Sequence, residues 1–450
     1  MALNKKNKIL SNSGEIKLTG QRTWLRAQKI IPGGTMLFSK NPDLYLPKKW
    51  PAYFSKTKGC SIWDLDNKKF VDMSVMGLGT NILGYSNFSV DREVKKVIDQ
   101  GNLSTLNNIE EITLAEKLVE MHPWAKMVRH VRTGAESNSL AIRLARAATG
   151  KNKVAICGYH GWNDWYLSSN LKNKKSLNNH LIKNLSVEGV DTNLKDSTFV
   201  FDFNDYSSLN EIESSNEYAA IIMELARKDY QNINFLKKIR TICDQKKIIL
   251  IFDECTSGFR ETYGGLHLKL GINPDIATFG KALGNGYSIC SVVGKEEVMS
   301  EVNNTFISST FWTDRIGPAA AIKTLNLMSK LKSWKVISQQ GKKYKELLKK
   351  VAKKNNIHID IYGLNALPKF DFKQSNNFYK TFISQEFLKR NILATNGIYI
   401  CIDHNDKKIK NYFEIMDDIF YKISKNEKEG NNPEILLENE VCINSIRQSN

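Results

Sequence analysis

The chain has 450 residues, of which 41% are hydrophobic and 25% charged, and these values are typical of a globular protein rather than a short binding module. Its formal net charge is +18, but lysines occur throughout the sequence, which favours a generally basic surface over a nucleic-acid groove. The N-terminal segment lacks an apolar signal core, and no apolar run approaches the roughly 20 residues of a membrane span. We therefore expect a cytoplasmic protein that binds neither nucleic acid nor membrane.

The cysteines and histidines follow no disulfide or metal-binding pattern. The seven cysteines are odd in number and contain no CxxC pair, and the seven histidines include no HExxH motif. This pattern favours reduced thiols and predicts no metal site. The cysteines are Cys60, Cys157, Cys243, Cys255, Cys290, Cys401 and Cys442.

The predicted elements change character along the chain. Residues 50–75 are predicted to form short antiparallel strands with an Asp-Asn turn. From about residue 130, continuous apolar strands alternate with amphipathic helices, which predicts an α/β fold whose central sheet is mostly parallel and covered on both faces. The strands are expected at 153–158, 218–224, 248–252, 275–280 and 289–294, and the clearest helices at 134–150 and 232–247.

The same pattern divides the chain into parts. We expect a large α/β domain at 76–325. The N-terminal segment 1–75 and the C-terminal segment 326–425 would pack together as a small α+β domain. Residues 426–450 are predicted to be a polar linker and tail.

Two charged residues directly follow predicted strands. Asp253 comes after "IILIF", and Lys281 comes after "DIATFG". Ligands of parallel sheets bind beyond the carboxyl ends of the strands, so both side chains are expected at one edge. Taken singly, Asp253 could cap a turn and Lys281 could extend to the surface. Together they fit a carboxylate that pairs with the ring nitrogen of pyridoxal phosphate and a lysine that forms an imine with it.

A third candidate site is the start of the helix in "RTGAESNS". Its backbone N–H groups and positive end suit a single phosphate, although a simple N-cap explains the same residues. The stretch is neither a P-loop nor a dinucleotide fingerprint. Tyr159, in "GYHG" after another strand, could lie flat on a cofactor or simply belong to the core.

Together these motifs resemble the class III aminotransferases, which are fold-type I pyridoxal phosphate enzymes, and are most similar to glutamate-1-semialdehyde 2,1-aminomutase. The resemblance extends from "IPGG" at 31–34 to about residue 420. Its most specific part is "FDE" and "GFR" followed by "FGKALG", whereas "IPGG" and "WDLD" are weak singly.

The resemblance implies roles for individual residues. Lys281 would be the Schiff-base lysine and Asp253 the partner of the ring nitrogen, and both would be catalytic. The other implied cofactor-binding residues are Thr133, Gly134 and Ala135 at the phosphate, Tyr159 and His160 at the ring, Cys255 beneath it, and Thr310. Ala135 lacks the hydroxyl usual in the family.

Thr310 matches the threonine that reaches the phosphate from the neighbouring subunit. The resemblance therefore implies a homodimer with shared active sites.

The implied reaction moves an amino group from a donor such as glutamate to a carbonyl acceptor. Two other classes remain open at this point: an intramolecular aminomutase, and a basic binding protein with an inactive cofactor pocket. Three tryptophans, Trp162, Trp165 and Trp312, would suit a sugar or surface-polysaccharide precursor as acceptor, but could equally pack at an interface or lid.

Two departures from the aminomutase favour transfer between two substrates. Lys40 stands where the aminomutase has a carboxylate-binding arginine. The segment 162–189 replaces a long glycine-rich lid with bulky, basic sequence.

Overall fold

The computed structural model describes residues 19–226 and 232–443. The sequence prediction that the N-terminus carries no signal segment concerns mostly residues 1–18, which lie outside this range. Within it, no helix has both the length and the apolar character needed to cross a membrane.

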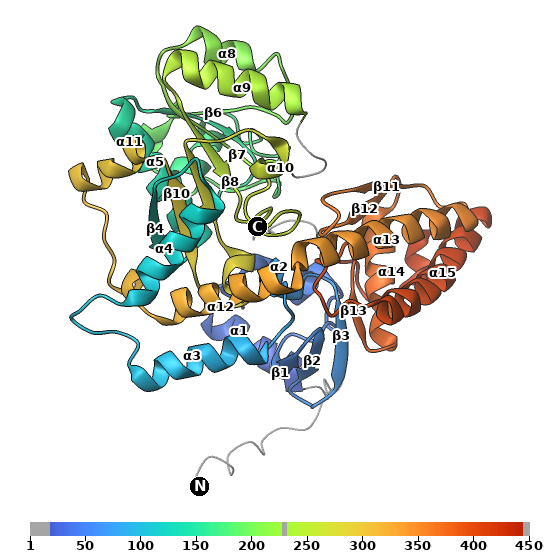
Figure 1. Ribbon diagram of the computed structural model, residues 1–450. Helices are drawn as coiled ribbons and strands as arrows, with labels where there is room; N and C mark the ends of the chain where they lie inside the picture. The colour runs from blue at the N-terminus through green and yellow to red at the C-terminus, as the bar shows by residue number, and fades with distance from the viewer. Residues whose placement is uncertain (1–18, 227–231, 444–450) are drawn as a thin grey trace.

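A seven-stranded sheet forms the centre of the larger lobe, in the order β4-β10-β9-β8-β7-β5-β6 (Figure 1). The predicted α/β fold with a mostly parallel sheet is confirmed, with one exception: β10 runs antiparallel to both β4 and β9. In chain order the strands are β4 (Met127–Val131), β5 (Lys153–Cys157), β6 (Thr198–Val200), β7 (Tyr218–Met223), β8 (Ile249–Asp253), β9 (Ile276–Phe279) and β10 (Cys290–Gly294).

Helices cover both faces of this sheet, as the apolar strands require. The buried face of α5 packs on β7, β8, β9 and β10, and α9 packs on β8. The helices of this part are α2 (Met76–Gly79), α3 (Phe88–Gln100), α4 (Ile109–Met121), α5 (Gly134–Thr149), α6 (Asp164–Leu167), α7 (Ser169–Lys172), α8 (Leu209–Ser214), α9 (Ile233–Lys246), α10 (His267–Leu270), α11 (Glu296–Met299) and α12 (Ile316–Leu331).

A second, four-stranded sheet joins the two ends of the chain. Strands β1 (Phe54–Lys58), β2 (Ser61–Asp64) and β3 (Lys69–Met73) form an antiparallel meander, and β13 (Ile392–Ala394) pairs with β3 in parallel. The rest of this lobe comprises α1 (Thr19–Ile30), α13 (Ser333–Lys354), α14 (Asn376–Lys389), α15 (Asp406–Lys428) and the hairpin of β11 (Ile359–Tyr362) and β12 (Lys369–Phe372).

The segment expected to be a polar tail folds back onto the protein. Its first residues complete α15, and a short 3-10 helix, Pro433–Leu436, follows. Gln385 donates a hydrogen bond to the Leu436 carbonyl, and the Cys442 N–H donates to the Thr381 hydroxyl. The polar composition of the segment concealed these anchors, which hold the described residues up to 443 in place.

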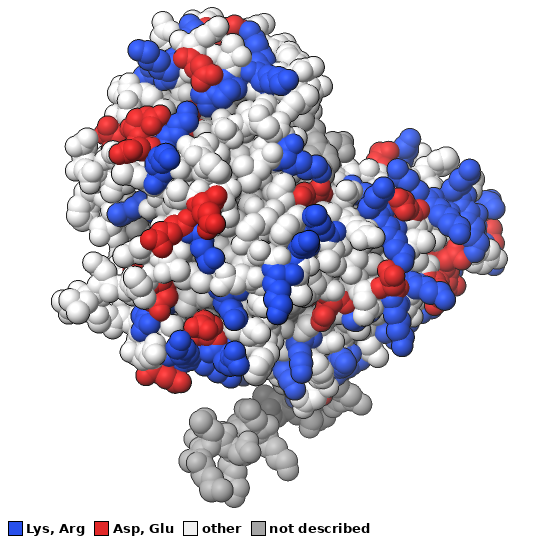
Figure 2. Space-filling model, viewed as in Figure 1, with Lys and Arg blue, Asp and Glu red and all other residues white. Residues whose placement is uncertain are grey.

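On the face of the small lobe that Figure 2 shows, positive charge is spread out and interspersed with negative charge. On the face shown in Figure 2, Lys and Arg are dense over the lobe that carries α13, α14 and α15, with carboxylates between them. Lys343 pairs with Asp406 at 2.7 Å, and Lys422 pairs with Asp418 at 3.1 Å. Such exposed, alternating charges contribute little stability individually.

Candidate active site

Three of the predicted residues, Asp253, Lys281 and His160, lie at the carboxyl edge of the large sheet. Asp253 is the last residue of β8, and Lys281 follows β9 after a single glycine. His160 follows β5 and reaches the Asp253 carboxylate. The start of α5, which follows β4, also reaches Asp253 through Asn138. The strand order therefore brings together four segments that are far apart in the sequence.

Asp253 is a buried carboxylate with several hydrogen-bond donors. Its Oδ2 accepts hydrogen bonds from Asn138 Nδ2 at 2.7 Å and from His160 Nδ1 at 2.8 Å, and its Oδ1 accepts one from the Cys255 N–H at 3.0 Å. Burial alone would raise the pKa of Asp253, but the His160 imidazole, the Cys255 N–H and the nearby Lys281 charge lower it to about 2. Asp253 is therefore ionised at neutral pH although it is 4% exposed.

Two residues that the sequence reasoning missed complete this network. Asn138 also donates to the His160 carbonyl at 3.1 Å, and its Oδ1 accepts a hydrogen bond from the Thr278 hydroxyl at 2.9 Å. A signal for Asn138 was present: it lies four residues after Gly134, and residues at this spacing share one face of a helix.

Lys281 begins a short 3-10 helix, Lys281–Gly284, in a left-handed backbone conformation with φ of 43°. A non-glycine residue held in this region carries about 1–3 kcal/mol of strain, and such strain is concentrated at functional sites. The Lys281 Nζ donates a hydrogen bond to the Thr256 hydroxyl at 2.7 Å. Thr256, which was not predicted, thus holds the amine near Asp253.

The start of α5 keeps its first backbone N–H groups available for an anion. Thr133 and Glu136 form a reciprocal capping box, in which the Thr133 hydroxyl accepts from the Glu136 N–H at 3.3 Å and the Glu136 carboxylate accepts from the Thr133 N–H at 2.8 Å. The Thr133 hydroxyl also donates to that carboxylate at 3.1 Å. The hydroxyl therefore serves the helix itself, and the N–H groups of Gly134 and Ala135 are the ones positioned for a phosphate.

The turn after β5 lies directly on this helix start. Gly161 has φ of 114°, and a Cβ added there would lie 2.9 Å from the Cβ of Ala135, so glycine is required. The backbone N–H of Tyr159 donates to the Glu224 carboxylate at 3.0 Å, which fixes the same turn. The Tyr159 ring packs edge-on against Tyr166, with 5.8 Å between ring centroids.

Cys255 lies beneath the helix start as a protonated, weakly polar side chain. Its hydrogen bond with the Cys290 thiol, together with burial, raises the pKa of the Cys255 thiol well above its usual range. A Cβ added at Gly134 would lie 3.3 Å from the Cys255 sulfur, so the glycine and the thiol are in close contact. The volume and character of Cys255 suit contact with an aromatic ring.

These groups fit pyridoxal phosphate. The N–H groups at the start of α5 suit its phosphate, the ionised Asp253 suits a protonated ring nitrogen, and the Lys281 amine suits its aldehyde. Each partner is present on this chain and faces the same end of the sheet.

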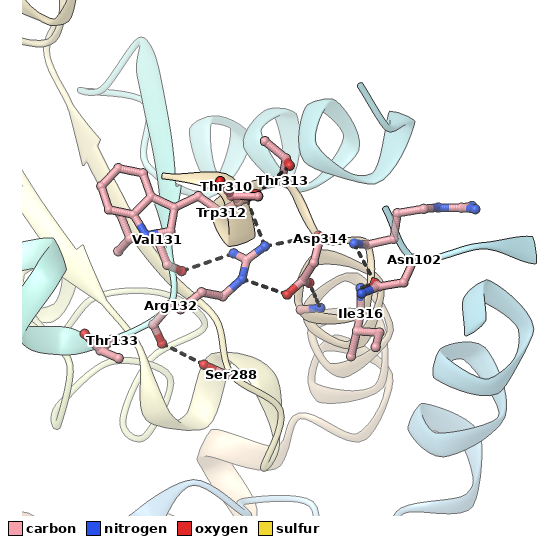
Figure 3. Close-up of polar contacts among 12 residues, drawn as sticks. Asn102, Val131, Arg132, Thr133, Ser288, Thr310, Trp312, Thr313, Asp314 and Ile316 are labelled. Carbon is pink, nitrogen blue, oxygen red and sulfur yellow. Dashed lines mark hydrogen bonds and ion pairs between the residues drawn. The ribbon is translucent and has the colours of Figure 1, made fainter. Parts of the chain in front are cut away.

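Thr310 and the three tryptophans are arranged differently. Thr310 is exposed at the start of a 3-10 turn, Thr310–Thr313, and Arg132 lies between this turn and Thr133 (Figure 3). Trp165 is only 8% exposed, and the Trp312 indole N–H donates to Glu136 at 3.3 Å. Only Trp162, 72% exposed, presents its ring to solvent, so the three do not form one aromatic wall.

Known proteins share this architecture over almost the whole chain. Residues 47–412 match the family model of the class-III aminotransferases. The chain is 30% identical to the 3-aminobutyryl-CoA aminotransferase of Cloacimonas acidaminovorans (strain Evry) over 415 residues, which cover 89% of this chain and 96% of the relative. It is also 30% identical to the glutamate-1-semialdehyde 2,1-aminomutase of Methanocaldococcus jannaschii over 422 residues, which cover 88% of this chain and 96% of that relative.

Solved structures share the fold. The FumI protein of Sphingopyxis sp. MTA144, in a form with pyridoxal phosphate, superposes with a TM-score of 0.82 at 22% identity and covers 93% of this chain and 99% of its own. An omega-transaminase from Sphaerobacter thermophilus superposes with a TM-score of 0.81 at 22% identity, and the match covers 91% of this chain and 99% of the transaminase. The chain belongs to the class III aminotransferase family. It is a pyridoxal-phosphate-dependent enzyme of the aminotransferase and aminomutase type.

Proposed function

We propose that this enzyme transfers an amino group between two separate substrates, from a donor such as glutamate to a carbonyl acceptor, with Lys281 and Asp253 as its catalytic residues. The observation that carries the proposal is the ionised, buried Asp253 at the same edge as an amine on a strained backbone. In this proposal the remaining cofactor contacts come from the predicted set Thr133, Gly134, Ala135, Tyr159, His160, Cys255 and Thr310.

Each residue of the site has a distinct role in the proposed reaction. Pyridoxal phosphate, when bound, supplies a ring that accepts electrons from the substrate carbon. The Asp253 carboxylate would hold a proton at the ring nitrogen, and His160 and Asn138 keep that carboxylate ionised and oriented. Lys281 Nζ would anchor the cofactor and would act as the base for the proton at the substrate Cα. The Thr256 hydroxyl, 2.7 Å away, orients that nitrogen.

The segment 162–189 supports two-substrate transfer over isomerisation. An isomerase of this kind must retain its diamine intermediate, for which a mobile lid is suited. Here Leu177 is fully buried, the Asn170 side chain bonds to the backbone of Leu177 and Leu185 at 3.0 Å, and Ser169 donates to Thr198 of the edge strand β6. The segment is thus anchored to the sheet edge.

Lys40 adds to this argument. It ends a short 3-10 helix, Phe38–Lys40, with its side chain exposed. An ammonium lacks the two-pronged geometry with which arginine binds a carboxylate, so Lys40 is a poor substitute at a carboxylate clamp.

We also infer that the enzyme is a cytoplasmic homodimer. Large apolar side chains flank the Thr310 turn: Leu106, Ile109 and Phe311 are 64–80% exposed, which is typical of a protein interface. If a second subunit covers this surface, Thr310 of the first subunit would lie near the cofactor of the second. The cytoplasmic location is supported by the seven cysteines, which all lie within the described residues as thiols outside any disulfide.

A sugar derivative is a second candidate for the acceptor. Trp162 directly follows Gly161, which contacts the helix start at Ala135, so the backbone of this exposed tryptophan lies next to the proposed phosphate site. Flat indole faces suit the C–H surface of a sugar. This support rests on Trp162 alone.

A half-reaction screen tests the proposal. Purified enzyme loaded with pyridoxal phosphate should show a visible absorbance band that glutamate converts to the aminated form, and a carbonyl acceptor should then restore it. A keto-sugar, a 3-oxoacyl thioester and a simple keto acid are compared as acceptors. Borohydride reduction should label Lys281, and a label on another lysine would overturn its assignment.

The isomerase alternative is tested on the same protein. Incubation with glutamate 1-semialdehyde and no amino donor should give little 5-aminolevulinate. Efficient formation of that product would reject two-substrate transfer as the main activity.

A further inference from the structure

Arg132 binds the turn that carries Thr310. Its Nε donates to Asp314 Oδ2 at 3.1 Å, and its Nη2 donates to the carbonyls of Trp312 at 2.9 Å and Asp314 at 3.1 Å (Figure 3). Both charged side chains are mostly buried, at 10% and 19% exposure. A guanidinium that contacts two carbonyls and a carboxylate fixes the turn in one geometry, which a lysine cannot reproduce.

A second link runs parallel to the first. The Trp312 indole donates to Glu136 Oε1, while Glu136 Oε2 accepts from the backbone N–H groups of Arg132 and Thr133 at 3.0 and 2.8 Å. Residues 132–136 therefore contact the turn through both Arg132 and Glu136. These are the residues whose backbone is placed to hold the phosphate of this subunit's own cofactor.

The turn is also joined to the large domain beyond it. Asp314 Oδ1 accepts from the Gly317 N–H at the start of α12, and Asn108 Nδ2 donates to the Thr313 carbonyl at 3.0 Å. Arg315 pairs with Glu110 at 2.7 Å. The turn is thus held on both sides, and Thr310 at its start is exposed to solvent.

We propose that Arg132 is a positioning residue that acts across the dimer: it fixes the Thr310 that one subunit gives to the cofactor phosphate of the other. The inference rests on the proposed function, because it takes the shared dimer and Thr310 from there. It assigns to Arg132 a role in the partner's site in addition to any role at its own helix start. The two cofactor sites are thereby connected through residues 132–136 and the turn.

Mixed dimers separate these two roles. One subunit carries Lys281, and the other, with a different affinity tag, carries Lys281→Ala, so only the first binds cofactor covalently. Arg132→Lys is then placed only in the Lys281→Ala subunit, whose Thr310 serves the intact site. We expect cofactor to leave that site about tenfold faster, the size expected for disturbing one charged hydrogen bond to the phosphate. The readout is loss of the visible absorbance after dilution into a trap for released cofactor.

Two controls go into the same Lys281→Ala subunit. Thr310→Ala must also accelerate release; if it does not, Thr310 is not shared and the proposed dimer site fails, taking this inference with it. Arg240→Lys is the matched control, because it also removes a guanidinium that pairs with a buried carboxylate. Arg240 lies 2.9 Å from Asp275, whose side chain is 8% exposed, and this pair is elsewhere in the large domain. This variant should leave the release rate unchanged.

The inference is overturned if Thr310→Ala accelerates release from the partner's site but Arg132→Lys does not. It is equally overturned if Arg132→Lys acts only when placed in the subunit that holds the cofactor, because its role would then be local. Should Arg132→Lys fail to form dimers, Asp314→Asn weakens the same contact from its other end with little change in shape, and the same outcomes apply.

Discussion

Asp253 and Glu254 are consecutive, buried carboxylates, and each accepts a hydrogen bond from an imidazole Nδ1 at 2.8 Å, yet their surroundings differ. Glu254 is fully enclosed: it also accepts from the Ser257 hydroxyl at 2.6 Å and from the N–H groups of Leu266 and His267. The far nitrogen of His267 accepts from the Trp124 indole at 2.9 Å.

The Asp253 pair is less complete. The far nitrogen of His160 is buried without a hydrogen-bond partner among the residues that the structure describes. The charge of Lys281 lies close enough to lower the pKa of Asp253. A carboxylate–imidazole pair therefore occurs here in two settings. The Glu254 pair is surrounded by protein donors and stabilises the fold. The Asp253 pair lies beside an amine at a sheet edge, which is the setting expected of a catalytic carboxylate in the proposed function.

The largest difference between the two carboxylates should appear in turnover. In the proposed function Asp253 keeps the ring nitrogen protonated, so Asp253→Asn should lower kcat by orders of magnitude while cofactor remains bound. Glu254→Gln should keep kcat close to wild type for the folded fraction. Steady-state rates and the visible absorbance of both variants test this, and a near-wild-type rate for Asp253→Asn would remove it from the catalytic residues.

Stability should show the reverse order. Burial alone would raise the pKa of Glu254, but its hydrogen bonds with His267 and Ser257 lower it, so the carboxylate is charged in the fold. Glu254→Gln removes a charged acceptor from a buried network of hydrogen-bond donors and should lower the free energy of unfolding by about 3 kcal/mol in urea.

Glu213→Gln is the matched control for that measurement. Its salt bridge to Lys238 is about two-fifths exposed, so the loss should stay below about 0.5 kcal/mol. Equal losses for the two variants would contradict the structural role of Glu254.

The pH dependence of stability in acid tests how much His160 contributes to the low pKa of Asp253. The folded pKa of Asp253 is about 2, below the usual 3.8, so its contribution to stability is complete above about pH 4 and is lost as the pH falls towards 2. His160→Leu removes a donor, raises that pKa and should move the loss upward by roughly one pH unit. The pH at which unfolding free energy falls most steeply is measured, and an unchanged value would contradict the pairing.

Within the Glu254 network, the smallest effect should come from the outermost donor. Trp124→Phe removes the indole N–H that His267 accepts and should cost about 1 kcal/mol, with turnover unchanged. Trp162→Phe, at an exposed position, should cost less than about 0.5 kcal/mol. A larger loss at Trp162 than at Trp124 would reverse the expected ranking of the two sites.

The parts of the site that follow strands could be predicted from sequence. Asp253 and Lys281 come directly after apolar runs, and the carboxyl ends of parallel strands share an edge. The direction of β10 was missed, because a strand buried on both faces carries no directional pattern. The connection from β9 to β10 was a usable signal, since it is shorter than a parallel crossover normally requires.

Side-chain pairs between distant segments could not be predicted. Arg132 and Asp314, or Glu254 and His267, become neighbours only through the three-dimensional arrangement, and neither pair has a characteristic spacing. The hydroxyl of Thr256 likewise meets Lys281 only because the backbone reverses after β8. Such contacts depend on packing geometry, which periodicity and composition do not encode.

The pairing of β13 with β3 sets an order of events during synthesis. The β1–β3 meander is complete once Met73 has left the ribosome, but its last partner, Ile392–Ala394, is made near the end of translation. Until then β3 presents a row of unpaired backbone groups, which is a template for strands of other nascent chains. A chain that stops before Ile392 keeps this edge open, so premature termination yields an aggregation-prone product even though the residues of the large sheet are all present.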